Sequence, residues 1–480
     1  MNYKIVGRII SKILALEALF MIPPVIICAV DGNTKTCFAF LIAIALTLAL
    51  AGLMYLVCRK AKKAFYAKEG FVCVGLSWIF LSLIGCLPLI ISGEIPRFVD
   101  AFFEIVSGFT TTGASIVPNV EELSRGVLYW RSFSNWLGGM GVLVFLLAID
   151  PIGSSSLHLL RAESPGPSVG KIVPKMRQTA KILYLLYIVL TVIDIFFLLM
   201  GGLSLFESVC TAFSTAGTGG FGIKADGMAS FSPYIQNVCT VFMMLFGVNF
   251  TCFYLLLLRN FKGVFKNEEL RFYIITFAAA VTLIAFNIRD MYDTVEETIR
   301  HSAFQVASLI TSTGFATTDF NLWPSFSKAI LFVLMFVGAC AGSTGGGIKC
   351  ARVLLYIKTF FRSIRQTLHP QKIQLIRTDG EPTDEKIIRN TLGYLCAYVI
   401  LILISFFIVS IDGFSFETNM SSVVSCFNNM GPGFDSAGPM ANYNGFSDVS
   451  KLVLIWDMLA GRLELFPILV LFAPSTWRRV

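Results

Sequence analysis

The sequence predicts an all-α membrane protein in which two N-terminal helices precede four parallel membrane–pore–membrane repeats around a central pore. The first observation is compositional: 55% of the 480 residues are hydrophobic and only 14% are charged, whereas soluble domains carry about 25% charged residues. The second is a series of apolar runs of about 20 residues, the length that spans a bilayer. The third is a pattern of long run, short run, Gly-containing segment and long run, which occurs four times.

Ten apolar runs are long enough for membrane spans. They fall near 11–30, 38–58, 71–92, 131–150, 178–201, 233–258, 271–288, 327–340 with a continuation to about 361, 390–411 and 449–473. Shorter apolar runs lie near 99–109, 203–213, 300–311 and 417–427. Because the shorter runs cannot cross a bilayer, we expect them to form re-entrant half-helices.

The repeated pattern sets the organisation of the chain. We expect two transmembrane helices in 1–68, followed by repeat 1 in 69–177, repeat 2 in 178–270, repeat 3 in 271–385 and repeat 4 in 386–480. Every repeat begins and ends on the same side of the membrane, so the repeats are parallel about an axis along the membrane normal. Four such units around one axis enclose a pore.

Loop charges predict the orientation. Basic residues gather in one set of loops: Arg59, Lys60, Lys62, Lys63 and Lys68; Arg161, Lys171, Lys175 and Arg177; Arg259, Lys262, Lys266 and Arg271; Lys358, Arg362, Arg365, Lys372 and Arg377. The alternate loops are acidic or mixed, and they contain all four short runs. The positive-inside rule therefore places both termini in the cytoplasm and the short runs on the outer side. Pro23 and Pro24 interrupt the first apolar run, which favours a retained membrane helix over a signal peptide.

The composition also argues against several classes of function. With 3 His, and 12 Cys that form no Cys-x-x-Cys pair, a His-based metal site, structural zinc and a redox motif are disfavoured. The net charge of +8 is carried by loops between apolar runs and requires no nucleic-acid partner. A membrane enzyme is disfavoured because no His/Glu metal motif, triad or phosphate loop is present.

The ends of the four short runs can be placed in register. The segments are Ser107–Gly113 (SGFTTTG), Thr211–Gly217 (TAFSTAG), Ser308–Gly314 (SLITSTG) and Ser425–Gly431 (SCFNNMG). Each starts with a hydroxyl residue and ends with Gly. In the first three segments an acidic or amide residue lies nine or ten positions before the Gly, namely Glu104, Glu207 and Gln305. In the fourth segment Ser422 takes this place more loosely. The register of the second segment is less secure, because Gly219 and Gly220 follow closely.

These segments suit the binding of a dehydrated cation. Backbone carbonyl groups in an extended segment replace the water of the ion, and Gly permits backbone angles closed to other residues. The C-terminal, negative ends of the half-helices would favour a cation over an anion. The predicted filter residues are Thr111, Thr112, Gly113, Thr215, Ala216, Gly217, Ser312, Thr313, Gly314, Asn429, Met430 and Gly431.

A second Gly-rich run, from Gly338 to Lys349, interrupts the predicted span 327–361. Its notable residues are Gly342, Gly345, Gly346, Gly347 and Lys349. The spacing is not that of a phosphate-binding loop, and no strand precedes it. Close helix packing through small residues is the alternative, but the run is longer and richer in Gly than packing alone requires.

Arg462 falls in the middle of the last predicted span, where a charge is costly and points to a function. A structural pair with Asp457 or Glu464 is the alternative, although neither spacing places the acid on the same helix face as Arg462.

In combination these motifs resemble the Trk/Ktr/HKT superfamily of K+ transporters, and most closely its Trk-type membrane subunit. The resemblance covers essentially the whole chain and includes, besides the four Gly segments, Asn135–Gly141 (NWLGGMG), Gly342–Lys349 (GSTGGGIK) and Asn428–Gly433 (NNMGPG). It implies K+ as the transported ion, no covalently bound cofactor and a multi-pass protein of the bacterial plasma (inner) membrane. It also implies a homodimer with one pore per subunit, and a separate cytosolic NAD- or ATP-binding regulatory subunit, TrkA-like. In this family the run that matches Gly342–Lys349 gates the pore, and the matching Arg faces the cavity.

We therefore predict K+ uptake through a four-repeat selectivity filter that an intramembrane loop gates. The residues leave open whether transport is channel-like or coupled to H+ or Na+ as symport, and which nucleotide the partner senses. The alternative is a secondary transporter of another cation, Na+-coupled, or of a small solute. Such a transporter would have inverted halves and a few midplane charges rather than four parallel repeats.

Overall fold

The computed structural model describes residues 1–60, 66–141, 176–372 and 374–477, and almost all of its regular structure is helical. Within these ranges the only sheet is one two-stranded hairpin. Six of the described helices or helix pairs are long and apolar enough to cross a bilayer, and a sharply bent pair is a seventh candidate. The predicted all-α membrane fold is confirmed. The end of the predicted span 131–150 and the predicted cytoplasmic residues Lys62, Lys63, Arg161, Lys171 and Lys175 lie outside the described residues.

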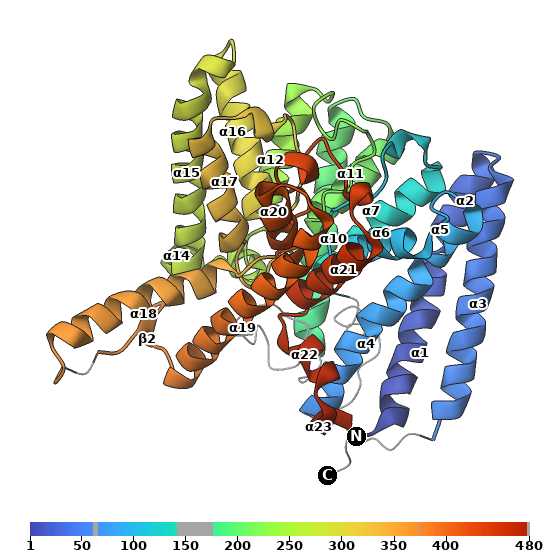
Figure 1. Ribbon diagram of the computed structural model, residues 1–480, viewed down its shortest axis with the longest axis horizontal. Coiled ribbons are helices and arrows are strands. Elements are labelled where there is room, and N and C mark those ends of the chain that lie inside the picture. The colour runs from blue at the N-terminus through green and yellow to red at the C-terminus, as the bar shows by residue number, and fades with distance from the viewer. Residues whose placement is uncertain (61–65, 142–175, 373, 478–480) are drawn as a thin grey trace.

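A helical hairpin at the N-terminus occupies one edge of the molecule (Figure 1). α1 (Tyr3–Phe20) and α2 (Ile22–Val30) form one apolar span, and α3 (Thr34–Cys58) returns beside α1. Pro23 lies in the first turn of α2, where its missing N–H costs no helical hydrogen bond. The outward face of α3 exposes large apolar side chains such as Leu53, as contact with lipid requires.

Four further long helical segments match the predicted first spans of the repeats. They are α4 (Ala67–Gly85) with α5 (Leu87–Ser92), α10 (Met176–Met200), α15 (Glu268–Ile288) and α19 (Glu385–Val409). Figure 1 places α15 at the edge opposite the N-terminal hairpin, so the short helices described next lie between the two edges.

The four short apolar runs form short helices, as predicted. They are α6 (Phe98–Phe109), α11 (Leu205–Gly217), α16 (Val295–Ile310) and α20 (Phe416–Phe427). A capping box starts α11: the Ser204 hydroxyl accepts the N–H of Glu207, whose carboxylate accepts the N–H of Ser204 at 2.9 Å. α11 continues past the predicted end of its run at residue 213, and this extension affects the register of the second Gly segment.

The helix after the second, third and fourth Gly segments is interrupted, whereas α7 (Arg125–Met140) follows the first and residues 142–175 beyond it lie outside the described range. The interrupted elements are α12 (Pro233–Phe246) with α13 (Phe250–Leu257), α17 (Ser325–Val337) with α18 (Cys350–Leu368), and α21 (Asp448–Arg462) with α22 (Phe466–Phe472). The predicted break between α17 and α18 is present. By contrast, the continuous spans predicted over 233–258 and 449–473 are wrong.

The two unexpected breaks have local causes. Between α12 and α13 the axis turns by 89°, and the Asn249 side chain starts α13 by accepting the N–H of Thr251 at 2.9 Å. After α21, Glu464 and Leu465 have φ of 56° and 63°, outside the right-handed helical region. Pro467 then occupies the first turn of α22, where it can start a helix but could not continue one.

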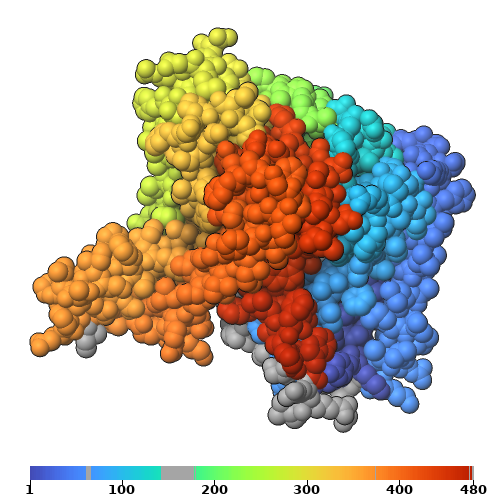
Figure 2. Space-filling view, viewed as in Figure 1, coloured from blue at the N-terminus to red at the C-terminus, as the bar shows by residue number. Residues whose placement is uncertain are grey.

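The C-terminal half of α18 extends away from the body of the protein (Figures 1 and 2). The hairpin of β1 (Arg377–Thr378) and β2 (Glu381–Pro382) follows it and leads into α19. Shorter elements complete the described fold: α14 (Phe261–Lys266), α23 (Pro474–Trp477), η1 (Val120–Glu122), η3 (Arg289–Met291), η4 (Phe320–Leu322), η5 (Ser410–Asp412), η6 (Asp435–Ala437) and η7 (Tyr443–Gly445).

Candidate functional site

The same backbone conformation follows each of the four short helices. One residue adopts a left-handed conformation, with φ between 53° and 57°, in Thr111, Thr218, Ser312 and Asn429. Two positions later a glycine has positive φ: Gly113 (79°), Gly220 (64°), Gly314 (84°) and Gly431 (89°). The N–H between them donates to the carbonyl of a serine five residues earlier, namely Ser107, Ser214, Ser308 or Ser425. Left-handed non-Gly residues are uncommon, so four copies at equivalent positions define one repeated site.

The shared backbone geometry places the second segment three residues later than Thr215–Gly217, at Gly220, one of the alternatives that the sequence left open. Thr215, Ala216 and Gly217 are the last residues of α11, and the glycine with the shared geometry is Gly220. Its serine is Ser214, not Thr211, and Glu207 caps the start of α11 instead of preceding the glycine by the expected spacing. A sequence signal for this register existed, because a serine lies six residues before the glycine in all four segments.

The four glycines close a ring. A Cβ on Gly113 would lie 2.2 Å from the carbonyl oxygen of Gly219 in the second segment. The same relation continues around the site: Gly220 to Thr313 O (2.0 Å), Gly314 to Met430 O (2.1 Å) and Gly431 to Thr112 O (2.7 Å). No real Cβ tolerates such distances, so only glycine permits each segment to pack against the backbone of the next. The order 1–2–3–4–1 places the segments around one axis.

Buried hydroxyl and amide groups hold the segments in place. Thr110 and Thr112 share a hydrogen bond of 2.8 Å between their hydroxyl groups, and Thr311 and Thr313 do the same at 2.8 Å. The Asn429 amide donates to the Thr112 hydroxyl at 3.0 Å and so joins the fourth segment to the first. A ring of backbone carbonyl groups held this rigidly can replace the hydration shell of a cation.

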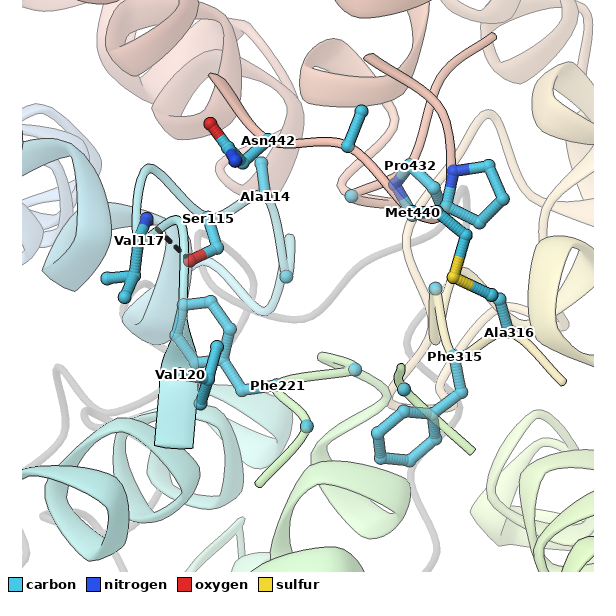
Figure 3. A pocket seen from close by; sticks show the side chains of 18 of the residues that line it. Ala114, Ser115, Val117, Val120, Phe221, Phe315, Ala316, Pro432, Met440 and Asn442 are labelled. Carbon is cyan, nitrogen blue, oxygen red and sulfur yellow. Dashed lines mark hydrogen bonds between the residues drawn. The ribbon is translucent and has the colours of Figure 1, made fainter. Parts of the chain in front are cut away.

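A cavity of about 130 Å³ opens on one side of the ring. It is lined by the four glycines and by the residues that follow them, Ala114, Phe221, Phe315 and Pro432, which surround a common space in Figure 3. Beside it, hydrogen bonds from the Ser415 and Thr418 hydroxyls hold the pKa of Asp435 below its ordinary value. Asp435, which lies two residues before the lining residue Ala437, is therefore ionised at neutral pH.

A buried ion pair supports the first and second segments from behind. Arg131 on α7 and Glu104 on α6 are 1% and 0% exposed, and their charged groups lie 2.7 Å apart. The Glu104 carboxylate also accepts hydrogen bonds from Ser115 and from the N–H of Ile116, just after Gly113. The Arg131 guanidinium lies 4.2 Å from the ring centre of Phe221, just after Gly220. The pair thus holds the residues that follow Gly113 and Gly220, and the two charges neutralise each other.

The Gly-rich run between α17 and α18 lies on the other side of the ring. The N–H of Gly346 donates to the Ser312 hydroxyl at 2.5 Å, and the N–H of Gly347 donates to the Asn428 carbonyl at 3.0 Å. A Cβ on Gly345 would lie 2.8 Å from the Thr311 carbonyl oxygen. These contacts involve the starts of the third and fourth segments, whereas the cavity involves their ends. The loop and the cavity therefore lie on opposite sides of the ring.

The same loop also forms hydrogen bonds with the bend between α12 and α13. The N–H of Cys340 donates to the Gly247 carbonyl at 3.1 Å, and the N–H of Phe250 donates to the Gly342 carbonyl at 3.1 Å. Within the loop, the buried Lys349 ammonium group donates to the Gly345 carbonyl. The 89° turn of the second inner helix thus provides the space and the hydrogen-bond partners for the loop.

Arg462 is the last residue of α21 and lies beneath the ring. The sequence had suggested a place in the middle of a continuous span. Its guanidinium donates to the Thr344 carbonyl of the loop at 3.0 Å and to the Gly139 carbonyl at the end of α7 at 2.7 Å. The two acids considered as its partners make other contacts. Glu464 forms a 2.5 Å ion pair with Arg352 on α18, and Asp457 accepts the Ser405 hydroxyl at 2.6 Å.

A family model described as "TrkH: Cation transport protein" matches residues 36–479. The chain belongs to the TrkH family. The predicted resemblance to the Trk-type membrane subunit is therefore confirmed, and so is the prediction of a transport protein rather than an enzyme.

Curated relatives and a solved structure agree with membership of the TrkH family. The Trk system potassium uptake protein TrkH of Halomonas elongata is 33% identical, and that of Escherichia coli (strain K12) is 34% identical, each over 100% of both chains. The crystal structure of the potassium transporter TrkH from Vibrio parahaemolyticus superposes with a TM-score of 0.89 at 29% identity, and it also covers 100% of both chains.

Sequence reasoning missed several residues that shape the site of this TrkH-family chain. Gly220 was left open as an alternative to Gly217, and the serine spacing described above favours it. Glu104 was noted for its position, but its partner Arg131 carried no pattern that separated it from an ordinary helix residue. Glu269, which contacts the loop from the start of α15, and Arg352 sit among other charges near predicted loops and gave no distinct signal.

Proposed function

We propose that this chain mediates K+ uptake across the bacterial plasma (inner) membrane, with both termini in the cytoplasm. The observation that carries the proposal is the closed ring in which each positive-φ glycine packs against a carbonyl group of the next segment. Four parallel backbone segments around an axis suit a cation that exchanges water for carbonyl oxygens. Relatives named as potassium uptake proteins support K+ as the ion.

The proposed filter keeps three of the predicted segments and replaces the second. Its residues are Thr111, Thr112 and Gly113; Thr218, Gly219 and Gly220; Ser312, Thr313 and Gly314; Asn429, Met430 and Gly431. The left-handed residue and the glycine of each triplet turn the backbone so that successive carbonyl groups can face a common axis.

The loop from Gly338 to Lys349 is proposed as the gate. Gly346 and Gly347 bond to filter segments directly, so an ion that leaves the ring on this side meets the loop first. Arg462 adds a positive charge at the same place, and a cation that has lost its hydration shell is sensitive to such a charge. Both elements oppose flow in the arrangement seen here.

The functional assembly is proposed to be a homodimer with one filter per subunit, controlled by a separate cytosolic NAD- or ATP-binding subunit that is TrkA-like. The projecting α18 and the hairpin β1–β2 form a surface that such a partner could contact. Because α18 begins directly after the loop, a movement of α18 would be transmitted to the loop. Arg365 and Lys372, which are exposed on this projection, carry positive charge for a docking partner.

Reconstituted vesicles test the function. Rb+ or K+ should enter along an imposed K+ gradient, with Na+ conducted less well, and no Na+ gradient should be required. Uptake that depends on a Na+ gradient would favour the Na+-coupled alternative, and transport of an organic solute without K+ flux would overturn the proposal. A dependence on the proton gradient would identify H+ symport.

A further inference from the structure

Glu269 joins the two ends of the Gly-rich loop. Its Oε1 atom accepts the N–H of Ala341, near the start of the loop, at 2.6 Å, and the N–H of Ala351, in the first turn of α18, at 3.1 Å. Ten residues of chain separate these two donors, and one carboxylate oxygen brings them together. Glu269 itself belongs to the first turn of α15, a separate helix.

The contact also completes the start of α18. The first N–H groups of a helix have no intrahelical partner, and Lys349, the residue before α18, offers no side-chain cap. The N–H of Cys350 is taken by the Ala339 carbonyl and the N–H of Ala351 by Glu269. A side-chain oxygen that accepts such N–H groups stabilises the start of a helix. Without Glu269, two backbone N–H groups in this partly buried region would lose their partner.

The residue before Glu269 is fastened to the projecting hairpin. The N–H of Glu268 donates to the Asp379 carboxylate at 2.7 Å, and the Glu268 carboxylate pairs with Lys358 on α18. The Lys358 ammonium group also donates to the Arg377 carbonyl of β1 at 2.6 Å. The hairpin, the middle of α18 and the start of α15 are thus one bonded unit, which ends at Glu269.

We propose that Glu269 is the positioning residue that latches the loop beneath the ring, and that the hairpin Arg377–Pro382 is the element through which the latch is released. This inference rests on the proposed gating role of the loop. A partner that shifts the hairpin moves Glu268 through Asp379 and Lys358, and Glu269 moves with it. Both ends of the loop then lose their shared acceptor, and the glycines between them permit the loop to change shape.

Three variants and two measurements test the latch in the full-length protein reconstituted in vesicles. Glu269→Ala removes the acceptor, Glu269→Gln keeps an acceptor oxygen, and Asp290→Ala removes an exposed acid just beyond the other end of α15 as the matched control. The first measurement is Rb+ uptake. The second is alkylation of two buried thiols, Cys340 within the loop and Cys350 directly after it, followed by peptide mass spectrometry.

For Glu269→Ala we expect both uptake and alkylation to rise at least about tenfold, because two hydrogen bonds to the ends of the loop are lost and one alone corresponds to roughly that ratio. Glu269→Gln should remain much closer to the parent, and Asp290→Ala should equal it. Unchanged alkylation in Glu269→Ala would overturn the latch, whatever the uptake. Raised alkylation with unchanged uptake would support the latch and overturn the proposed gating role of the loop.

Asp379→Gly provides a second route if Glu269→Ala does not insert. Asp379 is exposed on the hairpin and has a φ of 53°, which glycine adopts without strain, so this variant should leave the fold intact while it cuts the link to Glu268. We expect a smaller rise in alkylation of Cys340 and Cys350. Alkylation equal to that of the parent would overturn the role of the hairpin.

Discussion

The guanidinium group of Arg462 bonds to the Thr344 carbonyl of the loop at 3.0 Å, and it also bonds to the carbonyl groups of Gly138 and Gly139 on α7. One side chain therefore connects the inner helix of the fourth predicted repeat, the inner helix of the first and the loop from the third. This connection holds the loop against the ring and places a positive charge beside it.

Replacing Arg462 by Ala should increase K+ flux several-fold. The substitution removes the loop's bond to α21 and the positive charge that opposes a cation at this depth. Selectivity for K+ over Na+ should be kept, because the ring itself is unchanged. Rb+ uptake into vesicles and K+/Na+ permeability ratios measure the two effects. Arg462→Lys retains the charge and should lie between parent and Ala variant.

If the Ala variant inserts normally and conducts no more than the parent, the loop is a packing element and the gate lies elsewhere.

Periodicity and length predicted most of the fold, because lipid-facing helices must be long and apolar and the short runs had no room to span. The breaks in 233–258 and 449–473 were missed for a physical reason. The breaks fall at Asn249 and Glu464, two of several polar residues scattered through these runs, and such a run is compatible with a continuous helix until its tertiary partners are known. Those partners are the loop near Asn249 and Arg352 near Glu464.

The candidate site was predictable where local backbone demands are strict. Gly113, Gly314 and Gly431 have positive φ, and their hydroxyl-to-glycine spacing was visible in the sequence. In the second segment Gly217 was preferred to Gly220 because Thr211 and Gly217 have the same spacing, whereas α11 continues as helix through Gly217. The contacts of Glu269 and Arg131 depend on helices far apart in the chain, so no local pattern could reveal them.

Gly220→Ser should lower the K+ over Na+ permeability ratio or prevent stable assembly of the ring. Its Cβ would lie 2.0 Å from the Thr313 carbonyl oxygen, and the φ of 64° adds strain for a residue with a side chain. Ion gradients across vesicles give the ratio. Gly52→Ala on α3, where a Cβ meets nothing within 4 Å, is the matched control and should behave as the parent. A Gly220→Ser protein with unchanged ratio would remove this residue from the filter.

Glu104→Gln should destabilise the protein by about 3–5 kcal/mol, the usual consequence of removing one partner from a buried ion pair. Arg131 is 1% exposed and would keep a charge without its counter-ion. Thermal unfolding in detergent measures the loss. The double variant Glu104→Gln with Arg131→Met should recover part of it, since the unpaired charge is then absent. Equal stability of parent and single variant would contradict the assigned role of the pair.

Gly346→Ala should raise flux without loss of selectivity. In the arrangement seen here, a Cβ on Gly346 would lie 2.3 Å from the Asn428 carbonyl oxygen and 3.1 Å from the Ser312 hydroxyl oxygen, so the loop cannot remain seated against the ring. The φ of Gly346 is not positive, and an alanine is therefore tolerated once the loop moves away. The substitution destabilises only the conformation in which the loop is seated against the ring, and it therefore shifts the population towards the conformation in which the loop is withdrawn.

Rb+ uptake and permeability ratios test this shift, with Ser343→Ala as the control. The Ser343 hydroxyl donates to the Cys340 carbonyl at 2.6 Å, a contact within the loop, so its removal should leave the seating against the ring intact. Raised flux in Gly346→Ala with an unchanged K+/Na+ ratio would separate gate from filter. Lower flux would mean that the seated loop is required for conduction, because the one contact that the added methyl group breaks is the contact with the ring.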